Sequence, residues 1–150
     1  MFLDSVAFTL AHAVEEWLVR SHGAPLWQYF GRISGLILKD VPGFLATIGL
    51  PTVVLSVLAW LAYDMEQEWA ISMLFGARIG DASINHGLFW LIGYRPNPGQ
   101  TTASIYLIEA AGIGYNLGVG EPWFAALGFA MFAGTVPVMW GIKRLINENN

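Results

Sequence analysis

His12-Ala13-Val14-Glu15-Glu16 lies inside an otherwise apolar run that extends from Val6 to Val19. Residues three and four apart share a helix face, so His12, Glu15 and Glu16 are expected to project in the same direction. Imidazole and carboxylate groups are ligands that zinc, iron and manganese accept. In hydrocarbon each ionisable side chain costs about 2.5–3.5 kcal/mol on the insertion scale. Three of them on one short apolar helix therefore indicate a functional site.

The composition is typical of a membrane protein. Of the 150 residues, 55% are hydrophobic and only 12% are charged, whereas about 25% of residues are charged in ordinary globular domains. The net charge of −4 provides no basic surface for nucleic acid, so no nucleic-acid partner is expected. The chain has no cysteine, which excludes disulfides, thiolate metal ligands and cysteine nucleophiles. The N-terminus lacks the positive region of a signal peptide, and we expect the first helix to be retained.

The apolar runs predict an all-α fold, a polytopic membrane helix bundle with about five transmembrane helices. A further amphipathic segment combines aromatic and basic residues, which suits the headgroup region of a bilayer. The predicted spans are 3–19, 44–63, 69–94, 100–117 and 123–142, with an interfacial helix at 26–40, in one domain covering 1–150.

Charges alternate between the predicted loops. The loops expected on one side hold Arg20, Arg32, Lys39, Arg95, Lys143 and Arg144, and those on the other hold Asp64, Glu66, Glu68 and Glu121. Basic residues favour the cytoplasmic side. The pattern predicts a protein integral to a membrane, expected to be a bacterial inner membrane, with its N-terminus outside and its C-terminus in the cytoplasm.

Ionisable residues of three predicted spans are expected at similar depths. At about 1.5 Å per residue, His12, His86 and Glu109 each lie roughly 12–15 Å from the basic end of their helices. Polar groups in a membrane bundle face its interior and pair with one another. The predicted metal ligands are His12, Glu15, Glu16, His86 and Glu109.

The predicted site would hold one or two divalent ions, zinc or iron. Glu15 or Glu16 would act as a catalytic general base, and Asp81, Asn85 and Thr102 would support the ligands. Arg78 and Asp81 share a helix face, and an internal ion pair between them is favoured over a direct ligand role for Asp81.

Non-catalytic interpretations of the same residues stay open. His12, Glu15 and Glu16 could form a hydrogen-bonded polar cluster that holds helices together, since buried polar groups act as interhelical contacts in membranes. His22, at a helix end, is expected to be a surface residue. Small-residue spacings that could allow close helix packing occur at 31–35, 76–80 and 114–118.

The chain resembles the HXXEE-domain family of membrane proteins. His12-Ala13-Val14-Glu15-Glu16-Trp17 resembles the motif that names the family, and Asn85-His86 resembles a downstream segment. The stretch from Tyr94 to Thr102 resembles the family's Tyr-x-Pro-Gly-x-x-Thr signature but is two residues longer between tyrosine and glycine. The resemblance covers residues 10–109 and implies a shared polar site in a membrane bundle, without naming a reaction.

Two classes of function follow from these features. The first is a membrane-embedded metal enzyme that acts on a lipid-like substrate, by hydrolysis with a metal-activated water or by oxidation with two carboxylate-bound irons. The second is a non-catalytic accessory subunit of a larger, energy-transducing membrane complex, with other membrane subunits as partners. A transporter or proton relay ranks last, because inverted repeats and paired broken helices are not visible.

Overall fold

The computed structural model describes residues 1–20, 23–35, 38–93 and 95–148. Apart from an isolated bridge residue at Ala24, the regular secondary structure of this part of the chain is helical, which confirms the all-α prediction. His22, which was predicted to be a surface residue, lies outside the described residues, and so does Tyr94, which begins the stretch that resembles the family signature.

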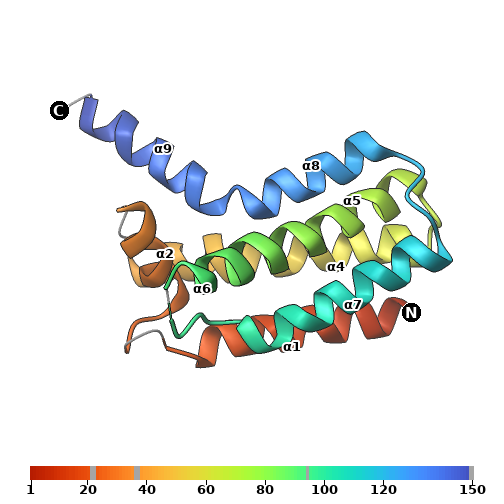
Figure 1. Ribbon diagram of the computed structural model, residues 1–150, viewed down its shortest axis with the longest axis horizontal. Coiled ribbons are helices and arrows are strands. Elements are labelled where there is room, and N and C mark those ends of the chain that lie inside the picture. Colours follow the sequence, from red (N-terminus) through yellow and green to blue (C-terminus); the bar gives the residue numbers. More distant parts are fainter. Residues whose placement is uncertain (21–22, 36–37, 94, 149–150) are drawn as a thin grey trace.

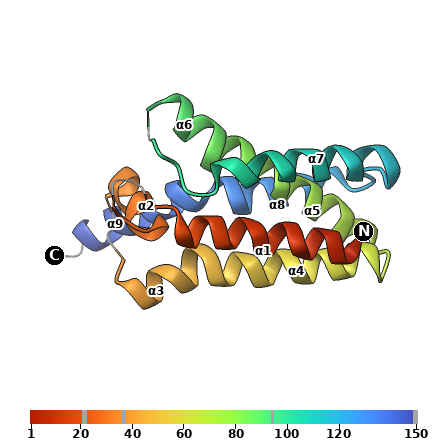
Figure 2. The same ribbon diagram turned by 90° about the horizontal axis from the view of Figure 1, so that it is seen from below.

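Long helices with roughly parallel axes form the body of the protein (Figures 1 and 2). They are α1 (Phe2–Leu18), α4 (Leu50–Tyr63), α5 (Glu68–Gly80), α7 (Gln100–Asn116) and α8 (Pro122–Ala133). Helix α5 packs against α4, α7 and α8. The buried core between these helices includes Leu58, Leu74, Tyr106, Ile113 and Phe132.

Two π-helical segments interrupt the α-helices in the part of the chain that the structure describes. The first, η1 (Leu45–Gly49), joins α3 (Asp40–Phe44) to α4, and the second, η2 (Asp81–Leu88), joins α5 to α6 (Phe89–Leu91). The predicted span 44–63 is thus one helical rod from Asp40 to Tyr63, and the predicted span 69–94 is helical from Glu68 to Leu91. π-Helical turns inside α-helices are frequent at functional sites.

The predicted interfacial helix at 26–40 is too long. Helix α2 (Leu26–Ser34) ends at Gly35, whose φ of +75° is readily adopted only by glycine. Leu26 and the aromatic residues Trp27, Tyr29 and Phe30 of α2 are buried in a second core, which also includes Met139 of α9 (Thr135–Glu148). Its apolar face therefore contacts protein.

The predicted span 123–142 is not one straight helix. It divides at Gly134 into α8 and α9, which are bent by 61° (Figure 1). Pro137 has no backbone N–H and so cannot continue the hydrogen bonding of α8 into α9. Helix α9 therefore leans away from the bundle.

Length and composition identify few membrane spans among the described helices. The rod Asp40–Tyr63 is long and apolar enough to cross a bilayer, and the bent α8–α9 pair would supply a second span. Helices α1 and α7 have 17 residues each, about 26 Å at the usual rise, against a hydrocarbon thickness of about 30 Å. The helical stretch from Glu68 to Leu91 carries three charged residues, Glu68, Arg78 and Asp81, and is therefore less apolar than the rod Asp40–Tyr63. A bundle of five spans is therefore not confirmed and stays a prediction.

Glycines allow α5 and α8 to approach closely. A Cβ atom added at Gly76 or Gly80 would collide with backbone atoms of Ala125 or Phe129 in α8, and one added at Gly128 would collide with the backbone of Met73. Of the three small-residue spacings, the one at 76–80 thus lies at a close helix–helix contact.

Candidate metal centre

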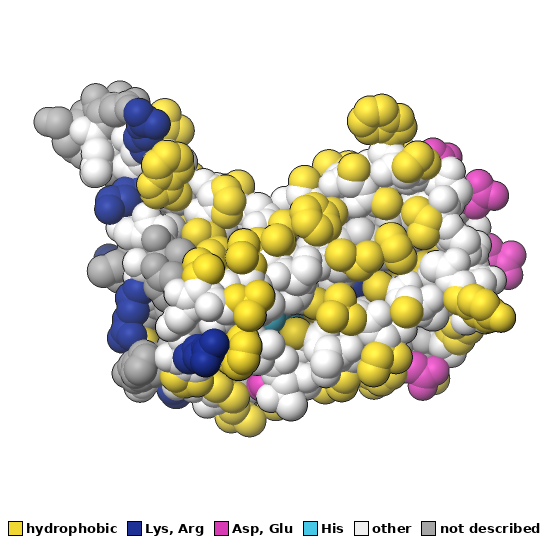
Figure 3. All heavy atoms as spheres, viewed as in Figure 1, with side chains coloured by type: hydrophobic (Ala, Val, Ile, Leu, Met, Phe, Trp, Pro, Cys, Tyr) yellow, Lys and Arg dark blue, Asp and Glu magenta, His cyan; other side chains and the backbone are white. Residues whose placement is uncertain are grey.

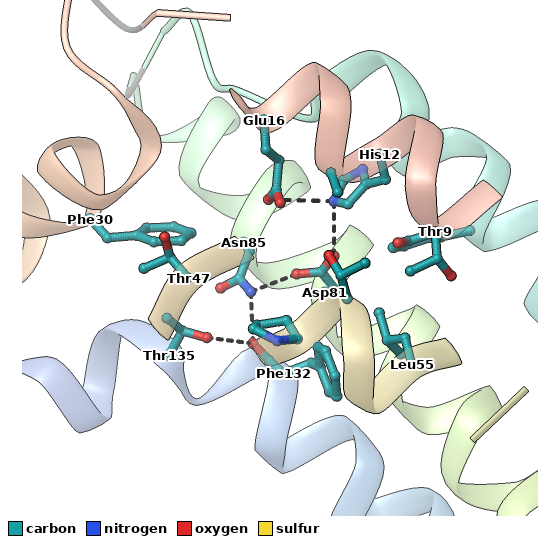
Figure 4. Close-up of a pocket in the computed structure, with 14 residues that line it drawn as sticks. Thr9, His12, Glu16, Phe30, Thr47, Leu55, Asp81, Asn85, Phe132 and Thr135 are labelled. Carbon is teal, nitrogen blue, oxygen red and sulfur yellow. Dashed lines mark hydrogen bonds and ion pairs between the residues drawn. The ribbon is translucent and has the colours of Figure 1, made fainter. Parts of the chain in front are cut away.

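Two imidazoles and two carboxylates converge in the bundle interior. His12 Nε2 lies 3.2 Å from Asp81 Oδ2 and 3.5 Å from Glu16 Oε1. His86 Nε2 lies 3.6 Å from Glu16 Oε1 and 3.7 Å from Asp81 Oδ2. All four side chains are buried, and Figure 4 shows His12, Glu16 and Asp81 directed toward one another. The four atoms come from α1 and η2, which are far apart in the sequence.

The spacing of these atoms fits a metal ion. Four ligands bonded at about 2.0–2.1 Å to a tetrahedral ion lie about 3.3–3.4 Å from one another. His12, Glu16 and His86 form a buried group that could hold a metal ion, and Asp81 Oδ2 contacts both of its imidazoles. Apart from these carboxylate oxygens, neither Nε2 atom has a hydrogen-bond partner. With neutral imidazoles the two buried carboxylates carry two negative charges, which a divalent cation would balance.

Asn97 holds His86 in the tautomer that binds metal. The Nδ2 atom of Asn97 donates to the backbone carbonyls of Asn85, at 2.7 Å, and His86, at 3.2 Å. Its Oδ1 atom therefore faces His86 Nδ1, at 3.1 Å, as an acceptor. The proton of His86 lies on Nδ1, so its Nε2 lone pair is free for the centre.

Thr102 and Asn85 orient the other ligands. His12 Nδ1 donates to Thr102 Oγ1 at 2.7 Å, and the threonine hydroxyl in turn donates to the carbonyl of Gly99 at 3.4 Å. Asn85 Nδ2 donates to Asp81 Oδ1 at 2.8 Å. The Nε2 atom of His12 and the Oδ2 atom of Asp81 thus remain available to an ion.

The π-helical geometry of η2 brings Asp81 and His86 together. In an α-helix, residues five apart are turned by about 140° from each other. In a π-helix each N–H bonds to the carbonyl five residues back, so residues five apart lie on the same face. α-Helical spacing puts Arg78 and Asp81 on one face, which is why an Arg78–Asp81 ion pair was predicted over a ligand role for Asp81. The structure places Asp81 beside both histidines instead.

Arg78 and Glu109 form a separate buried cluster. Arg78 Nε lies 2.8 Å from Glu109 Oε2, and Arg78 Nη2 donates to Thr9 Oγ1 at 2.7 Å. The Arg78 side chain has no exposed surface, and its guanidinium lies 3.9 Å from the centre of the Tyr106 ring. Glu109, a predicted metal ligand, is thus placed where it neutralises Arg78 and outside the four converging atoms.

Glu15 caps a helix. Its carboxylate accepts hydrogen bonds from the backbone N–H groups of Thr101, at 3.0 Å, and Thr102, at 2.7 Å. These groups belong to the first turn of α7, where a negative charge is stabilised by unpaired N–H groups. The adjacent carboxylates of the predicted motif therefore have different partners, Glu16 at the histidines and Glu15 at α7.

Gly99 and Asn97 contact the centre but were not predicted as site residues. Gly99 has a φ of +83°, and an added Cβ would lie 2.6 Å from His86 Cε1 and 2.7 Å from His12 Cε1. Only glycine fits both the backbone conformation and the space. In the sequence, Asn97-Pro98-Gly99 has the composition of an ordinary turn, and the signals for a role were the resemblance of Pro98-Gly99 to the Tyr-x-Pro-Gly-x-x-Thr signature and its position before Thr102.

Gly99→Ala is expected to weaken divalent-metal binding by about 10–100-fold, because the new methyl group displaces both imidazoles. Titration of the purified variant with zinc, monitored by calorimetry, measures this. Gly118→Ala is the matched control, since Gly118 has a φ of +76° but open space around it. Equal affinity in the two variants would show that Gly99 does not shape the centre.

Comparison with known proteins gives no relative. No protein-family model matches the chain, and neither the curated proteins nor the solved structures contain a significant match. The geometry of the residues is therefore what supports a function.

Proposed function

We propose that this protein is an integral membrane protein that binds one divalent metal ion through His12, Glu16, Asp81 and His86. The observation that carries the proposal is the convergence of four buried ligand atoms from α1 and η2. Glu15 and Glu109, the other predicted ligands, have partners of their own. A single ion is therefore favoured over a two-metal centre. We retain the resemblance to HXXEE-domain proteins as part of the proposal.

The chemistry we propose is metal-assisted hydrolysis. A bound divalent ion would supply Lewis-acid activation of a water or a carbonyl oxygen. The chain itself holds the ligands in fixed tautomers, through Asn97 and Thr102, and surrounds them with a buried shell. Glu16 contributes one oxygen to the group, and its second oxygen is the candidate general base.

The surface supports insertion of the bundle in a bilayer. Figure 3 shows Lys and Arg side chains at one end, Asp and Glu side chains at the other, and many hydrophobic side chains between. Trp123 and Ile108 are 84% and 70% exposed, respectively, which is unusual for large apolar residues unless they meet lipid or a partner. Helix α9 ends at the basic end and α1 begins at the acidic end (Figures 1 and 3). We therefore propose that the basic end is cytoplasmic.

A groove beside the centre supports a lipid-like substrate. A cavity of about 530 Å³ lies between η2–α6 and α7, with a mainly apolar lining that includes Leu88, Leu91 and Leu107. Two other lining residues, Gly87 and Ala103, directly follow His86 and Thr102 in the sequence. The size is in the range of small-molecule sites, and an acyl or isoprenoid chain matches the lining.

An accessory subunit of a larger membrane complex is the second candidate. Helix α9 leans away from the bundle (Figure 1), and its apolar residues Val138 and Trp140 are exposed. Another membrane subunit could cover this surface. In that case the protein would co-purify with a partner in mild detergent.

Metal analysis of protein purified from alkali-washed membranes tests the proposal. We expect the protein to stay in the membrane fraction and to bind about one equivalent of zinc or iron per chain. One zinc would support hydrolysis, and two irons would support oxidation by a dinuclear centre and contradict the single-ion proposal. Protein that is released by alkali would contradict membrane insertion, and protein that binds no divalent ion would contradict the metal centre.

A further inference from the structure

A small polar cavity adjoins the proposed metal ligands. It has a volume of about 30 Å³ and is lined in part by His12, Glu16 and Asp81. On the same scale a water molecule needs about 10–15 Å³, so the cavity has room for about two waters and is too small for an acyl chain. Its other polar walls are Asn85, Tyr106 and four threonines, Thr9, Thr47, Thr52 and Thr135.

These walls present hydrogen-bond acceptors. Each of the four threonine hydroxyls donates to a backbone carbonyl three or four residues earlier in the chain, at residues Ser5, Gly43, Ile48 and Phe132. The hydroxyl hydrogens of these threonines are therefore already donated to carbonyls. At Thr47, Thr52 and Thr135 the lone pairs of the hydroxyl oxygen can accept a hydrogen bond from a ligand. Thr9 already accepts a hydrogen bond from Arg78.

Asn85 supplies an acceptor without a partner. Its Nδ2 atom donates to Asp81 Oδ1, at 2.8 Å, and to the carbonyl of Phe132, at 2.7 Å. Its Oδ1 atom has no hydrogen-bond partner in the protein, and because the residue is only 2% exposed, bulk solvent does not supply one. Figure 4 shows this oxygen directed to the side on which Thr47 and Thr135 lie. A buried acceptor of this kind is costly unless a ligand or water donates to it.

We propose that this cavity is a binding site for a water molecule that is coordinated to the metal and donates a hydrogen bond to Asn85 Oδ1. The inference rests on the proposed metal centre and adds the position and the chemical class of a fifth ligand, beside the four protein atoms. A coordinated water directs a lone pair to the ion and keeps both hydrogens to donate. An anion would need several donors, whereas Asn85, Thr47, Thr52 and Thr135 offer acceptors.

Pulsed electron paramagnetic resonance of Mn(II)-loaded protein in D₂O tests the inference. The wild-type protein is expected to show exchangeable deuterons strongly coupled to the bound Mn(II), and added azide is expected to leave them in place. Thr47→Leu, which fills the cavity, is expected to bind Mn(II) with these deuterons lost. Thr47→Val, which keeps the side-chain shape, is the matched control and is expected to retain them.

The possible failures are distinguishable. Mn(II) bound without coupled deuterons, or with deuterons that azide displaces, would overturn the water site and leave the metal centre intact. Deuterons that persist in Thr47→Leu would place the water outside this cavity and overturn the inference. Protein that binds neither Mn(II) nor zinc would overturn the proposed centre and this inference with it, and protein that binds zinc but not Mn(II) would overturn the water site alone, because such a centre is closed to a further ligand. The wild-type and azide measurements decide the matter even if Thr47→Leu does not fold.

Discussion

His12→Ala/Glu16→Ala is expected to insert in the membrane in normal amount and to lose its bound metal, with affinity more than about 100-fold below wild type. Loss of a residue that only orients a ligand already costs about 10–100-fold, and this variant removes two of the four direct ligand candidates. Element analysis of the purified protein, after incubation with zinc and removal of free metal, measures the effect.

Glu15→Gln is the matched control for that experiment. It changes the adjacent carboxylate, whose partners are backbone N–H groups of α7, and an amide oxygen can still accept one of these hydrogen bonds. We therefore expect its metal content to equal that of the wild type. Metal loss in Glu15→Gln with retention in the double variant would reverse the roles assigned to the two glutamates.

Arg78→Met is expected to lower the free energy of unfolding by about 3–5 kcal/mol, because it leaves the carboxylate of Glu109 buried without its counter-charge. The guanidinium has no exposed surface and also donates to Ser5 and Thr9, so water does not replace its contacts. Unfolding in mixed detergent micelles, monitored by circular dichroism, measures the change.

Arg78→Met/Glu109→Met separates charge burial from packing. Replacing both members of a buried pair by apolar residues is often neutral or stabilising, so the second substitution is expected to restore most of the lost stability. We also expect both variants to keep their metal, because Arg78 and Glu109 lie outside the four converging atoms. An Arg78→Met variant as stable as the wild type would show that the ion pair contributes nothing.

Much of the helical architecture can be predicted from the sequence, because apolar runs and turn residues mark it. The run before Arg20 and the turn at Pro98-Gly99 place α1 and α7 within one residue of their observed ends. The bend between α8 and α9 has a local cause in Pro137, which the predicted span 123–142 did not take into account. The burial of α2 beneath α9 depends on packing between distant segments. No local pattern in the sequence specifies such contacts.

The candidate centre is only partly visible in the sequence. His12, Glu16 and His86 stand out as ionisable residues in apolar runs, and the structure brings them together. Asp81 was predicted to pair with Arg78 and to support the ligands, but not to be a ligand itself, because only the π-helical segment η2 turns it toward His86. The partners of Glu15 and Glu109 come from α7 and α5, at distant positions in the chain.

X-ray absorption spectroscopy of the zinc-loaded protein tests the central claim most directly. We expect nitrogen and oxygen ligands at about 2.0–2.1 Å, with the scattering pattern of two imidazoles, because His12 and His86 both direct Nε2 at the centre. A shell of oxygen ligands alone, or a spectrum unchanged by His12→Ala/Glu16→Ala, would contradict a metal held by these residues.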